Sequence, residues 1–300
     1  MSLALILPPD GAAALLRGWP IKPCVYRRDT DTLDRMISPE TLLEYIDTGS
    51  LPIEELSVVQ VGPVMNRGAY ARPDGRTDGA RLRHLLNHGY TVRLGHADRY
   101  MPGLARATQD IQAETGYSNY VTAFVTPAGH QGLDYHWDQN MAVVTQTGGR
   151  KRWELWQPVF DEPMRSIGDS RMEVRPEMIE RWKSAGPDMV FDLDPGDTLV
   201  VPRGWVHNPY ALDGDTVSVH ATFAIIERTR FWIAEHLVAL AITDPDFRLI
   251  VPPDVIAGDG FPTQLVRVRD LLVDYVSKLD QDELAAALRA AAAREIEFTS

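Results

Sequence analysis

The middle of this sequence contains short runs rich in β-branched and aromatic residues, and turns that contain glycine or proline separate them. Five such runs can be identified, at residues 120–126, 141–145, 150–157, 198–201 and 216–226. β-Branched and aromatic side chains favour extended strands, and several short strands joined by tight turns are typical of an antiparallel sandwich or barrel. The sequence therefore predicts a mainly β core, with helical regions before and after it along the chain.

A candidate metal site lies within this β-rich region. His136 and Asp138 are separated by one residue, so on a strand both side chains point to one face while Trp137 points away. His207 follows at the end of the sequence Pro-Arg-Gly-Trp-Val-His. Two imidazoles and one carboxylate leave coordination positions open, which is typical of non-haem Fe(II) oxygenases. The alternative is structural, because two hydrogen-bonded histidines and an edge-strand carboxylate give the same residue pattern.

Further motifs surround these residues in a fixed order. They are Thr-Pro-Ala-Gly-His-Gln-Gly at 126–132, His-Trp-Asp at 136–138, Gly-Arg-Lys-Arg-Trp at 149–153, Gly-Asp at 196–197 and Pro-Arg-Gly-x-x-His at 202–207. Together they resemble the JmjC-type cupins, and they are most similar to the branch that contains the ribosomal oxygenases, the Fe(II)- and 2-oxoglutarate-dependent protein hydroxylases. The resemblance covers the central third of the chain, with weaker similarity over residues 85–115.

The resemblance implies a fold and a set of site residues. The fold is the double-stranded β-helix, or jelly roll, of the cupins, followed here by C-terminal helices. The implied iron ligands are His136, Asp138 and His207, and Lys151 is the implied partner of the distal carboxylate of 2-oxoglutarate. Independently of the resemblance, an ammonium is a compact donor that suits a carboxylate in a partly desolvated pocket.

The chain departs from the family pattern near the expected substrate. Where the ribosomal-oxygenase branch has an asparagine and a tyrosine on the strand before the Pro-Gly loop, this chain has Thr122 and Phe124. A threonine hydroxyl still hydrogen-bonds a cosubstrate oxygen, whereas a phenylalanine ring does not. Ser218, on the strand after His207, is a further expected cosubstrate contact. The resemblance therefore constrains the chemistry more tightly than the substrate.

The implied reaction uses Fe(II), 2-oxoglutarate and O2, and it releases succinate and CO2 as a C–H bond of the substrate is hydroxylated. The favoured substrate is a protein or peptide side chain. The alternatives are the same chemistry on a small-molecule metabolite and a non-catalytic cupin that serves as a binding module; N-methyl-lysine demethylation ranks below side-chain hydroxylation. A long open groove above the metal would favour a polypeptide, whereas a cavity closed by the loop expected at 67–83 would favour a metabolite.

Several other residues have simpler explanations. His84 and His88 share one face of a helix expected at 80–88, but no glutamate follows the first and no cysteine lies nearby, so we expect helix-end cations rather than a zinc site. Arg150 and Arg152 flank Lys151 and should project to the opposite face, as surface residues. We expect core packing for the tryptophans of this region, Trp137, Trp153, Trp156 and Trp205. Two histidines without evident sequence partners are candidates for a place near the pocket, His130 and His220.

Composition agrees with a globular enzyme. The chain has 300 residues, 44% of them hydrophobic, and it has no apolar run long enough to cross a membrane. A formal net charge of −12 argues against general nucleic-acid binding. The apolar run at 3–7 lacks a basic leader and meets two prolines, so we expect no secretory signal. The single cysteine, Cys24, excludes an internal disulfide and fits a reducing cytoplasm.

We expect three parts along the chain. They are an α/β region at 1–115 that packs on the core, a catalytic core at 116–227 and a helical region at 228–300. Apolar spacing predicts helices at 39–48, 102–114, 229–242, 264–279 and 282–296. The C-terminal helices are expected to pack on the barrel or to form the surface of a homodimer. The ribosomal-oxygenase branch has both a dimerising helical segment and a winged-helix domain after its cupin, and the remaining stretch here is too short for both.

Overall fold

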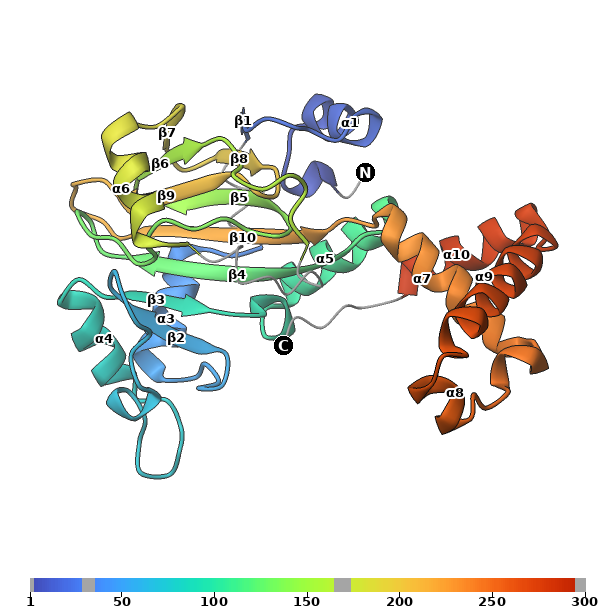
Figure 1. Ribbon diagram of the computed structural model, residues 1–300. Helices are drawn as coiled ribbons and strands as arrows, with labels where there is room; N and C mark the ends of the chain where they lie inside the picture. The colour runs from blue at the N-terminus through green and yellow to red at the C-terminus, as the bar shows by residue number, and fades with distance from the viewer. Residues whose placement is uncertain (1–2, 29–35, 165–173, 295–300) are drawn as a thin grey trace. The chain divides into compact units, whose positions relative to one another are not determined.

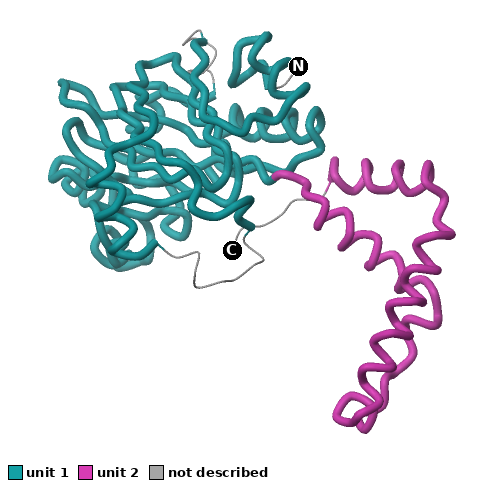
Figure 2. Tube along the Cα trace, turned by 45° about the horizontal axis from the view of Figure 1, so that its top comes forward, with its two compact units in different colours: residues 1–226, 297–300 teal, residues 227–296 magenta. Residues whose placement is uncertain are grey.

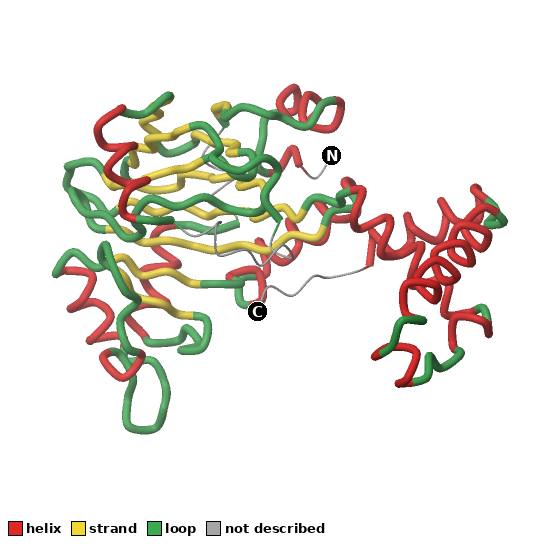
Figure 3. Tube along the Cα trace, viewed as in Figure 1, coloured by secondary structure: helices red, strands yellow, loops and turns green. Residues whose placement is uncertain are grey.

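The computed structural model describes residues 3–28, 36–164 and 174–294, and its chain divides into two compact units (Figures 1 and 2). The described strands all belong to the first unit, within residues 1–226. The described part of the second unit, within residues 227–296, consists of helices and loops (Figure 3). The candidate site residues therefore all belong to the first unit.

Antiparallel pairing builds two sheets in the first unit. The large sheet has seven strands in the order β1-β8-β5-β10-β4-β3-β2, with the bounds β1 Cys24–Arg27, β2 Leu56–Val59, β3 Thr91–Leu94, β4 Ser118–Thr126, β5 Met141–Gly148, β8 Asp197–Val201 and β10 Ser218–Ile226. The small sheet has the order β7-β6-β9, with the bounds β6 Lys151–Trp156, β7 Met189–Leu193 and β9 Val206–Ala211. An isolated antiparallel bridge joins His136 to His207 at the β9 side of the small sheet.

The chain alternates between the two sheets (Figure 1). It leaves β4 in the large sheet, forms the His136 bridge beside the small sheet, returns in β5, crosses in β6 and β7, returns in β8, crosses in β9 and finishes in β10. This alternation is the topology of a double-stranded β-helix, so the predicted fold is confirmed. The N-terminal strands extend the large sheet, because β1 pairs with β8 at one edge and β3 with β2 continues from β4 at the other.

The two sheets pack face to face. Strands β5 and β8 are buried along almost their whole length, as expected where both faces of a sheet are covered. An apolar cluster fills the space between the sheets and draws members from both, among them Val144 and Leu199 from the large sheet and Leu155 and Leu193 from the small one. The turn from β5 to β6 needs a glycine at 149, where φ is 56° and a Cβ atom would lie 2.4 Å from a carbonyl oxygen.

Helices of the first unit cover the sheets with their apolar faces. Their bounds are α1 Pro9–Arg17, α3 Pro39–Thr48, α4 Gly79–Asn87, α5 Pro102–Thr115 and α6 Pro176–Ala185, with short 3-10 turns at Leu3–Leu5, Arg67–Ala69 and Ala97–Arg99. The helices predicted at 39–48, 80–88 and 102–114 are confirmed to within one residue. Ser38 accepts a hydrogen bond from the amide of Thr41 at the start of α3, and Gly116 in the left-handed conformation ends α5.

Residues 67–83 are more regular than the loop that we expected. They form a 3-10 turn, a bridge between Ala71 and Thr77 and the first residues of α4. The Thr77 hydroxyl also donates to the Leu51 carbonyl at 2.6 Å. These bonds tie the segment to the first unit.

The second unit is helical. Its helices are α7 Arg230–Leu240, α8 Pro253–Ala257, α9 Phe261–Ser277 and α10 Gln281–Arg294, with 3-10 turns at Ala241–Thr243 and Pro245–Arg248. The helices predicted at 229–242 and 264–279 are confirmed, although the first tightens to a 3-10 turn and the second begins at Phe261. The helix predicted at 282–296 is confirmed as far as Arg294, and its last two positions lie outside the described residues. No described helix combines the length and the apolar character needed to cross a bilayer.

Candidate metal and cosubstrate site

A cavity of about 220 Å³ in the first unit brings together most of the site residues predicted from the sequence. Its lining includes the three expected metal ligands together with Lys151 and Thr122, whereas Ser218 is not part of it. The large sheet, the small sheet and the loop before β5 all contribute side chains to the wall.

His136, Asp138 and His207 converge in this cavity. One candidate ligand atom from each lies within 4.8 Å of the other two. The Nε2 atom of His207 is 3.7 Å from the Oδ2 atom of Asp138, and the centroids of the two imidazole rings are 4.2 Å apart. Metal bonds of about 2.0–2.2 Å place neighbouring ligand atoms roughly 3–4 Å apart, so the three side chains are close to the arrangement that one ion requires.

Backbone carbonyl groups orient both imidazole rings. Nδ1 of His136 is 2.6 Å from the carbonyl oxygen of Asp134, and Nδ1 of His207 is 3.0 Å from that of Trp205. Because a carbonyl oxygen only accepts, each Nδ1 carries the ring proton and each Nε2 keeps its lone pair. The two histidines also exchange backbone hydrogen bonds, at 3.2 and 2.8 Å. The rings are therefore held in the tautomer that a metal ligand requires.

The charge states at the site suit a divalent cation. Burial lowers the pKa of His207 to about 4, and the neighbouring His136 acts in the same direction. His207 is therefore neutral at pH 7 and does not need to lose a proton before it binds a metal. Asp138 keeps 47% of its side chain exposed and supplies the negative charge. Two imidazoles and one carboxylate fit Fe(II) with positions left open.

Asp138 is held in a different way from the one that the sequence predicted. We expected His136 and Asp138 to share the face of one strand, but β5 begins at Met141 and His136 forms a single bridge. No strand is assigned to residues 137–140, but the side chains of His136 and Asp138 converge as their spacing predicted. The amide of Gly204 donates to the Asp138 carbonyl at 2.8 Å, which ties the loop to the turn that precedes His207.

Lys151 places a buried ammonium in the same cavity. The residue is 2% exposed, and its Nζ atom donates to the Thr126 hydroxyl at 3.1 Å. Burial lowers the pKa of Lys151 to about 7. Among the described residues no carboxylate forms an ion pair with this ammonium. Because an unpaired buried cation is unfavourable, the cavity favours the entry of a carboxylate group.

His220 and Trp153 are further polar groups of the cavity wall. The sequence indicated His220 as a candidate near the pocket, and its place in the lining confirms this. Trp153 is buried, as the expected core role requires, and it also lines the cavity. The Nδ1 atom of His220 and the Nε1 atom of Trp153 are buried with no hydrogen-bond partner among the described residues. The period of two on β10 was the available signal, since Thr222 and Ala224 line the cavity with His220.

The remaining expected cosubstrate contacts differ in their positions. Thr122 on β4 is 5% exposed, lines the cavity and pairs with Thr222 on β10. Ser218 is fully buried outside the lining, and its hydroxyl accepts a hydrogen bond from Nε2 of Gln146 at 3.0 Å. The position of Thr122 fits a cosubstrate contact. Ser218 is covered by Gln146, a contact that the sequence did not predict.

Several other residues singled out in the sequence lie outside the cavity lining. Arg150 and Arg152 project away from the cavity and pair with Asp194 and Asp192 at 2.8 and 2.6 Å, as predicted. The rings of His84 and His88 lie 4.1 Å apart on α4, but within the described part of the chain no third ligand joins them. The remaining residues singled out in the sequence lie outside the cavity lining, namely Cys24, His130, Trp137, Trp156 and Trp205.

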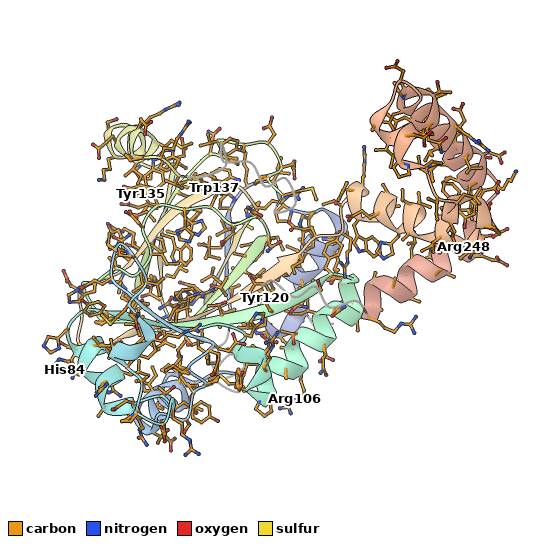
Figure 4. All side chains as sticks on the ribbon, turned by 60° about the horizontal axis from the view of Figure 1, so that its bottom comes forward. His84, Arg106, Tyr120, Tyr135, Trp137 and Arg248 are labelled. Atoms are coloured by element: carbon orange, nitrogen blue, oxygen red, sulfur yellow. The ribbon has the colours of Figure 1, made fainter. Side chains whose placement is uncertain are left out.

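A second hollow of about 390 Å³ continues from the cavity toward the β2 edge of the large sheet. Both hollows share the lining residues Ser57, Arg93, Tyr120 and Thr122. Tyr120, labelled in Figure 4, stands on β4 at this junction. Of the segment 67–83, Arg67 contributes to the second hollow. The cavity therefore opens into a groove.

A sequence profile described as a JmjC domain matches residues 96–229, which include every site residue predicted from the sequence. The "bifunctional lysine-specific demethylase and histidyl-hydroxylase NO66" of Drosophila persimilis is 26% identical over 173 residues, which cover 57% of this chain and 24% of that protein. The rat protein "Ribosomal oxygenase 2" is 24% identical over 268 residues, covering 87% of this chain and 54% of that protein. The chain thus spans a quarter to a half of the length of these curated relatives.

Solved structures share the fold. The Escherichia coli ribosomal oxygenase YcfD in complex with cobalt and succinic acid aligns with a TM-score of 0.58 at 16% identity, over 98% of this chain and 73% of that one. The same protein in complex with cobalt and 2-oxoglutarate aligns with a TM-score of 0.55. The order of motifs, the alternating sheets and these similarities agree. Residues 96–229 therefore match the JmjC domain, and the chain is similar to proteins named as ribosomal oxygenases.

Proposed function

We propose that this protein is an Fe(II)- and 2-oxoglutarate-dependent oxygenase that hydroxylates a side chain of a protein or peptide and releases succinate and CO2. One observation carries the proposal: two oriented imidazoles and a carboxylate share a cavity with a buried ammonium that has no carboxylate partner among the described residues. The first group of side chains is a metal site with open positions, and the second is a receptor for one end of a dicarboxylate. The names of the relatives support the same chemistry.

Each site residue has a task in this proposal. His136, Asp138 and His207 would hold the metal, and Lys151 would bind the distal carboxylate of 2-oxoglutarate. When bound, Fe(II) supplies the reaction with O2 that oxidises the keto acid and the substrate. Two backbone carbonyl groups fix the tautomers of the His136 and His207 rings. The Lys151 ammonium would neutralise the distal carboxylate of 2-oxoglutarate. Burial limits the access of water to Lys151 and His207, which are each 2% exposed.

The groove favours a polypeptide substrate over a metabolite. The cavity continues into a second hollow along β2 and β3, and segment 67–83 does not contribute a residue to the lining of the first. An extended opening accepts one side chain of a longer chain, whereas a small metabolite is better held in a closed cavity. The relatives named as histidyl-hydroxylases and ribosomal oxygenases support protein substrates. The alternatives are a metabolite substrate and a cupin that binds without catalysis.

We also propose a division of labour along the chain. Residues 1–115 would support the core, residues 116–227 would carry the reaction, and residues 228–300 would form a homodimer. Many large apolar side chains of the second unit are exposed, for example Val238, Ile242, Leu265 and Val273 at 54, 66, 54 and 63%. Exposed apolar surface of this kind is typical of interfaces. The single cysteine supports a reducing compartment, for which we propose the cytoplasm.

Anaerobic reconstitution tests the function. The purified chain is loaded with Fe(II) and 2-oxoglutarate, O2 is admitted, and succinate is measured with and without a library of peptides or of metabolites. We expect succinate formation that requires the metal and that peptides stimulate. Stimulation by a metabolite alone would support the first alternative. Binding of metal and keto acid without succinate under any condition would support the binding module.

A further inference from the structure

The imidazole of His220 lacks the hydrogen bond that its burial requires. The side chain is 2% exposed, it lines the cavity, and its Nδ1 atom has no hydrogen-bond partner among the described residues. A buried polar group without a partner costs about 1–3 kcal/mol. An unmatched polar group in the side chain of a cavity-lining residue calls for an explanation, and a hydrogen bond from this imidazole to a bound ligand is one.

The position of His220 matches that of Lys151. On β4, Phe124 and Thr126 point to the same face, and consecutive residues of one face are about 6.6 Å apart. His220 on β10 stands directly opposite Phe124, while the Lys151 ammonium is bonded to Thr126. The two groups therefore serve neighbouring positions on one wall.

Phe124 holds the imidazole in place. The two rings are parallel to within 6°, with their centroids 4.6 Å apart, and Trp153 contacts the edge of the same imidazole with a centroid distance of 5.8 Å. Phe124 offers no hydrogen bond of its own. The His220 imidazole that stacks on Phe124 can donate a hydrogen bond, so this wall of the cavity still carries a donor.

The His220 imidazole and the Lys151 side chain differ in charge. Burial lowers the pKa of His220 well below its ordinary value, and the Lys151 charge adds to the effect, so the imidazole is neutral at pH 7. A neutral imidazole carries one N–H and can donate one hydrogen bond. Lys151 then supplies the positive charge. His220 supplies one directional hydrogen bond without adding a second buried cation.

We infer that His220 is a second anchor for the cosubstrate, which donates an imidazole N–H to the same distal carboxylate that Lys151 binds. The inference rests on the proposed function and adds a residue to it. Two donors around one carboxylate select a dicarboxylic keto acid over one that has only the keto-acid end. Without the distal carboxylate both donors stay unmatched, which is the costlier state.

Direct binding measurements test this inference. Wild-type protein and variants are loaded anaerobically with Mn(II), and calorimetry gives the dissociation constants of 2-oxoglutarate and of 2-oxopentanoate, which lacks the distal carboxylate. His220→Phe keeps an aromatic ring against Phe124 but removes the N–H, and His220→Asn keeps an N–H donor. The matched control is His84→Phe, which removes an exposed histidine of α4, labelled in Figure 4.

We expect His220→Phe to weaken 2-oxoglutarate binding roughly 10- to 100-fold, the loss of one hydrogen bond to a charged group. Binding of Mn(II) and of 2-oxopentanoate should not change, His220→Asn should recover part of the loss, and His84→Phe should bind as wild type does. Wild-type affinity in His220→Phe, with weakened binding in Lys151→Ala, would overturn the inference and leave the proposed function standing. Failure of wild-type protein to bind 2-oxoglutarate would overturn both.

A measurement on the wild-type chain keeps the inference testable if His220→Phe does not fold. In protein labelled with 15N-histidine and loaded with Zn(II), a slowly exchanging imidazole N–H signal should appear or shift on addition of 2-oxoglutarate and not of 2-oxopentanoate. The signal is assigned with His220→Asn. Identical spectra with the two keto acids would overturn the inference.

Discussion

Two backbone carbonyl oxygens determine which ring nitrogens of the candidate metal site carry a proton. The carbonyls of Asp134 and Trp205 fix the ring protons of His136 and His207 on Nδ1, so both Nε2 atoms offer lone pairs before any ion arrives. The side chain of His207 is 3% exposed, whereas that of Asp138 is 47% exposed. The candidate ligand His207 is therefore fixed by the fold, and Asp138 is the candidate ligand that stays accessible.

Asp138→Ala should remove tight metal binding and with it metal-dependent succinate formation, because the site loses its charged ligand. Mutation of a metal-site group costs at least about 10- to 100-fold in affinity even outside the ligands themselves. The measurement is Mn(II) affinity by electron paramagnetic resonance, with circular dichroism to show that the fold persists. Asp134→Ala is the matched control, since its carbonyl and not its carboxylate orients His136. Full turnover in Asp138→Ala would contradict the assignment.

The affinity for 2-oxoglutarate should fall as pH rises above neutrality. In the free protein the pKa of Lys151 is lowered to about 7 by burial, and a bound carboxylate favours the ammonium and raises it again. Below pH 7 the ammonium is already present; above pH 7 binding must take up a proton, so the affinity falls by up to about tenfold per pH unit.

Calorimetry with Mn(II) between pH 6 and pH 9 measures this dependence in buffers of different ionisation enthalpy. Lys151→Ala should bind 2-oxoglutarate weakly at every pH and lose the slope. An affinity that stays flat across this range in the wild-type chain would show that Lys151 does not change its protonation on binding.

The turn before β9 connects the two halves of the metal site. Gly204 has a φ of 81°, and its amide donates to the Asp138 carbonyl at 2.8 Å. A side chain at this position favours a different backbone conformation, and the left-handed conformation costs a non-glycine residue about 1–2 kcal/mol. The turn therefore has to keep this conformation if it is to hold both Asp138 and His207.

Gly204→Ala should lower both the stability of the fold and the affinity for metal. Gly75→Ala is the matched control, because Gly75 has a φ of 83° and open space around its Cα but lies in the 67–83 segment. Both variants should lose about 1–2 kcal/mol in the free energy of unfolding by urea titration. Only Gly204→Ala should also bind Mn(II) more weakly. Equal metal affinity in the two variants would show that the turn does not hold Asp138.

At the scale of the whole molecule, the proposed homodimer depends on the second unit. Leu265→Asp and Val273→Asp place charges on side chains of α9 that are 54 and 63% exposed. If these side chains meet a second copy, each charge must be desolvated, and the dissociation constant of the dimer should rise by at least about tenfold. Analytical ultracentrifugation measures this, with Mn(II) affinity as the check on the first unit. A wild-type chain that stays monomeric at high concentration would contradict the proposal.

Local sequence patterns predicted the elements well and their partners less well. Strands β4, β5 and β8 and helices α3 and α5 follow from apolar spacing and from capping residues. The pairing of β1 with β8 joins segments far apart in the chain, and no local pattern indicates it. Without the family resemblance, spacing alone would have left the alternation of strands between two sheets open.

The same distinction applies within the candidate site. The spacing of His136 and Asp138 suggested one shared strand, but the structure uses a bond to a distant turn to hold the second residue. Ser218 is covered by Gln146, a contact between strands that the sequence does not reveal. The absence of a carboxylate beside Lys151 among the described residues is likewise a property of packing, which the sequence does not reveal.

If Lys151 binds 2-oxoglutarate as proposed, the thermal stability of the folded chain depends on the concentration of this keto acid. A dicarboxylate that binds the folded chain and not the unfolded one raises the melting temperature in proportion to the logarithm of its concentration. At a low concentration of the keto acid this stabilisation would be lost, and the chain would unfold more readily. Under the proposed function, the same fall in keto-acid concentration would lower both the stability of the folded protein and its turnover.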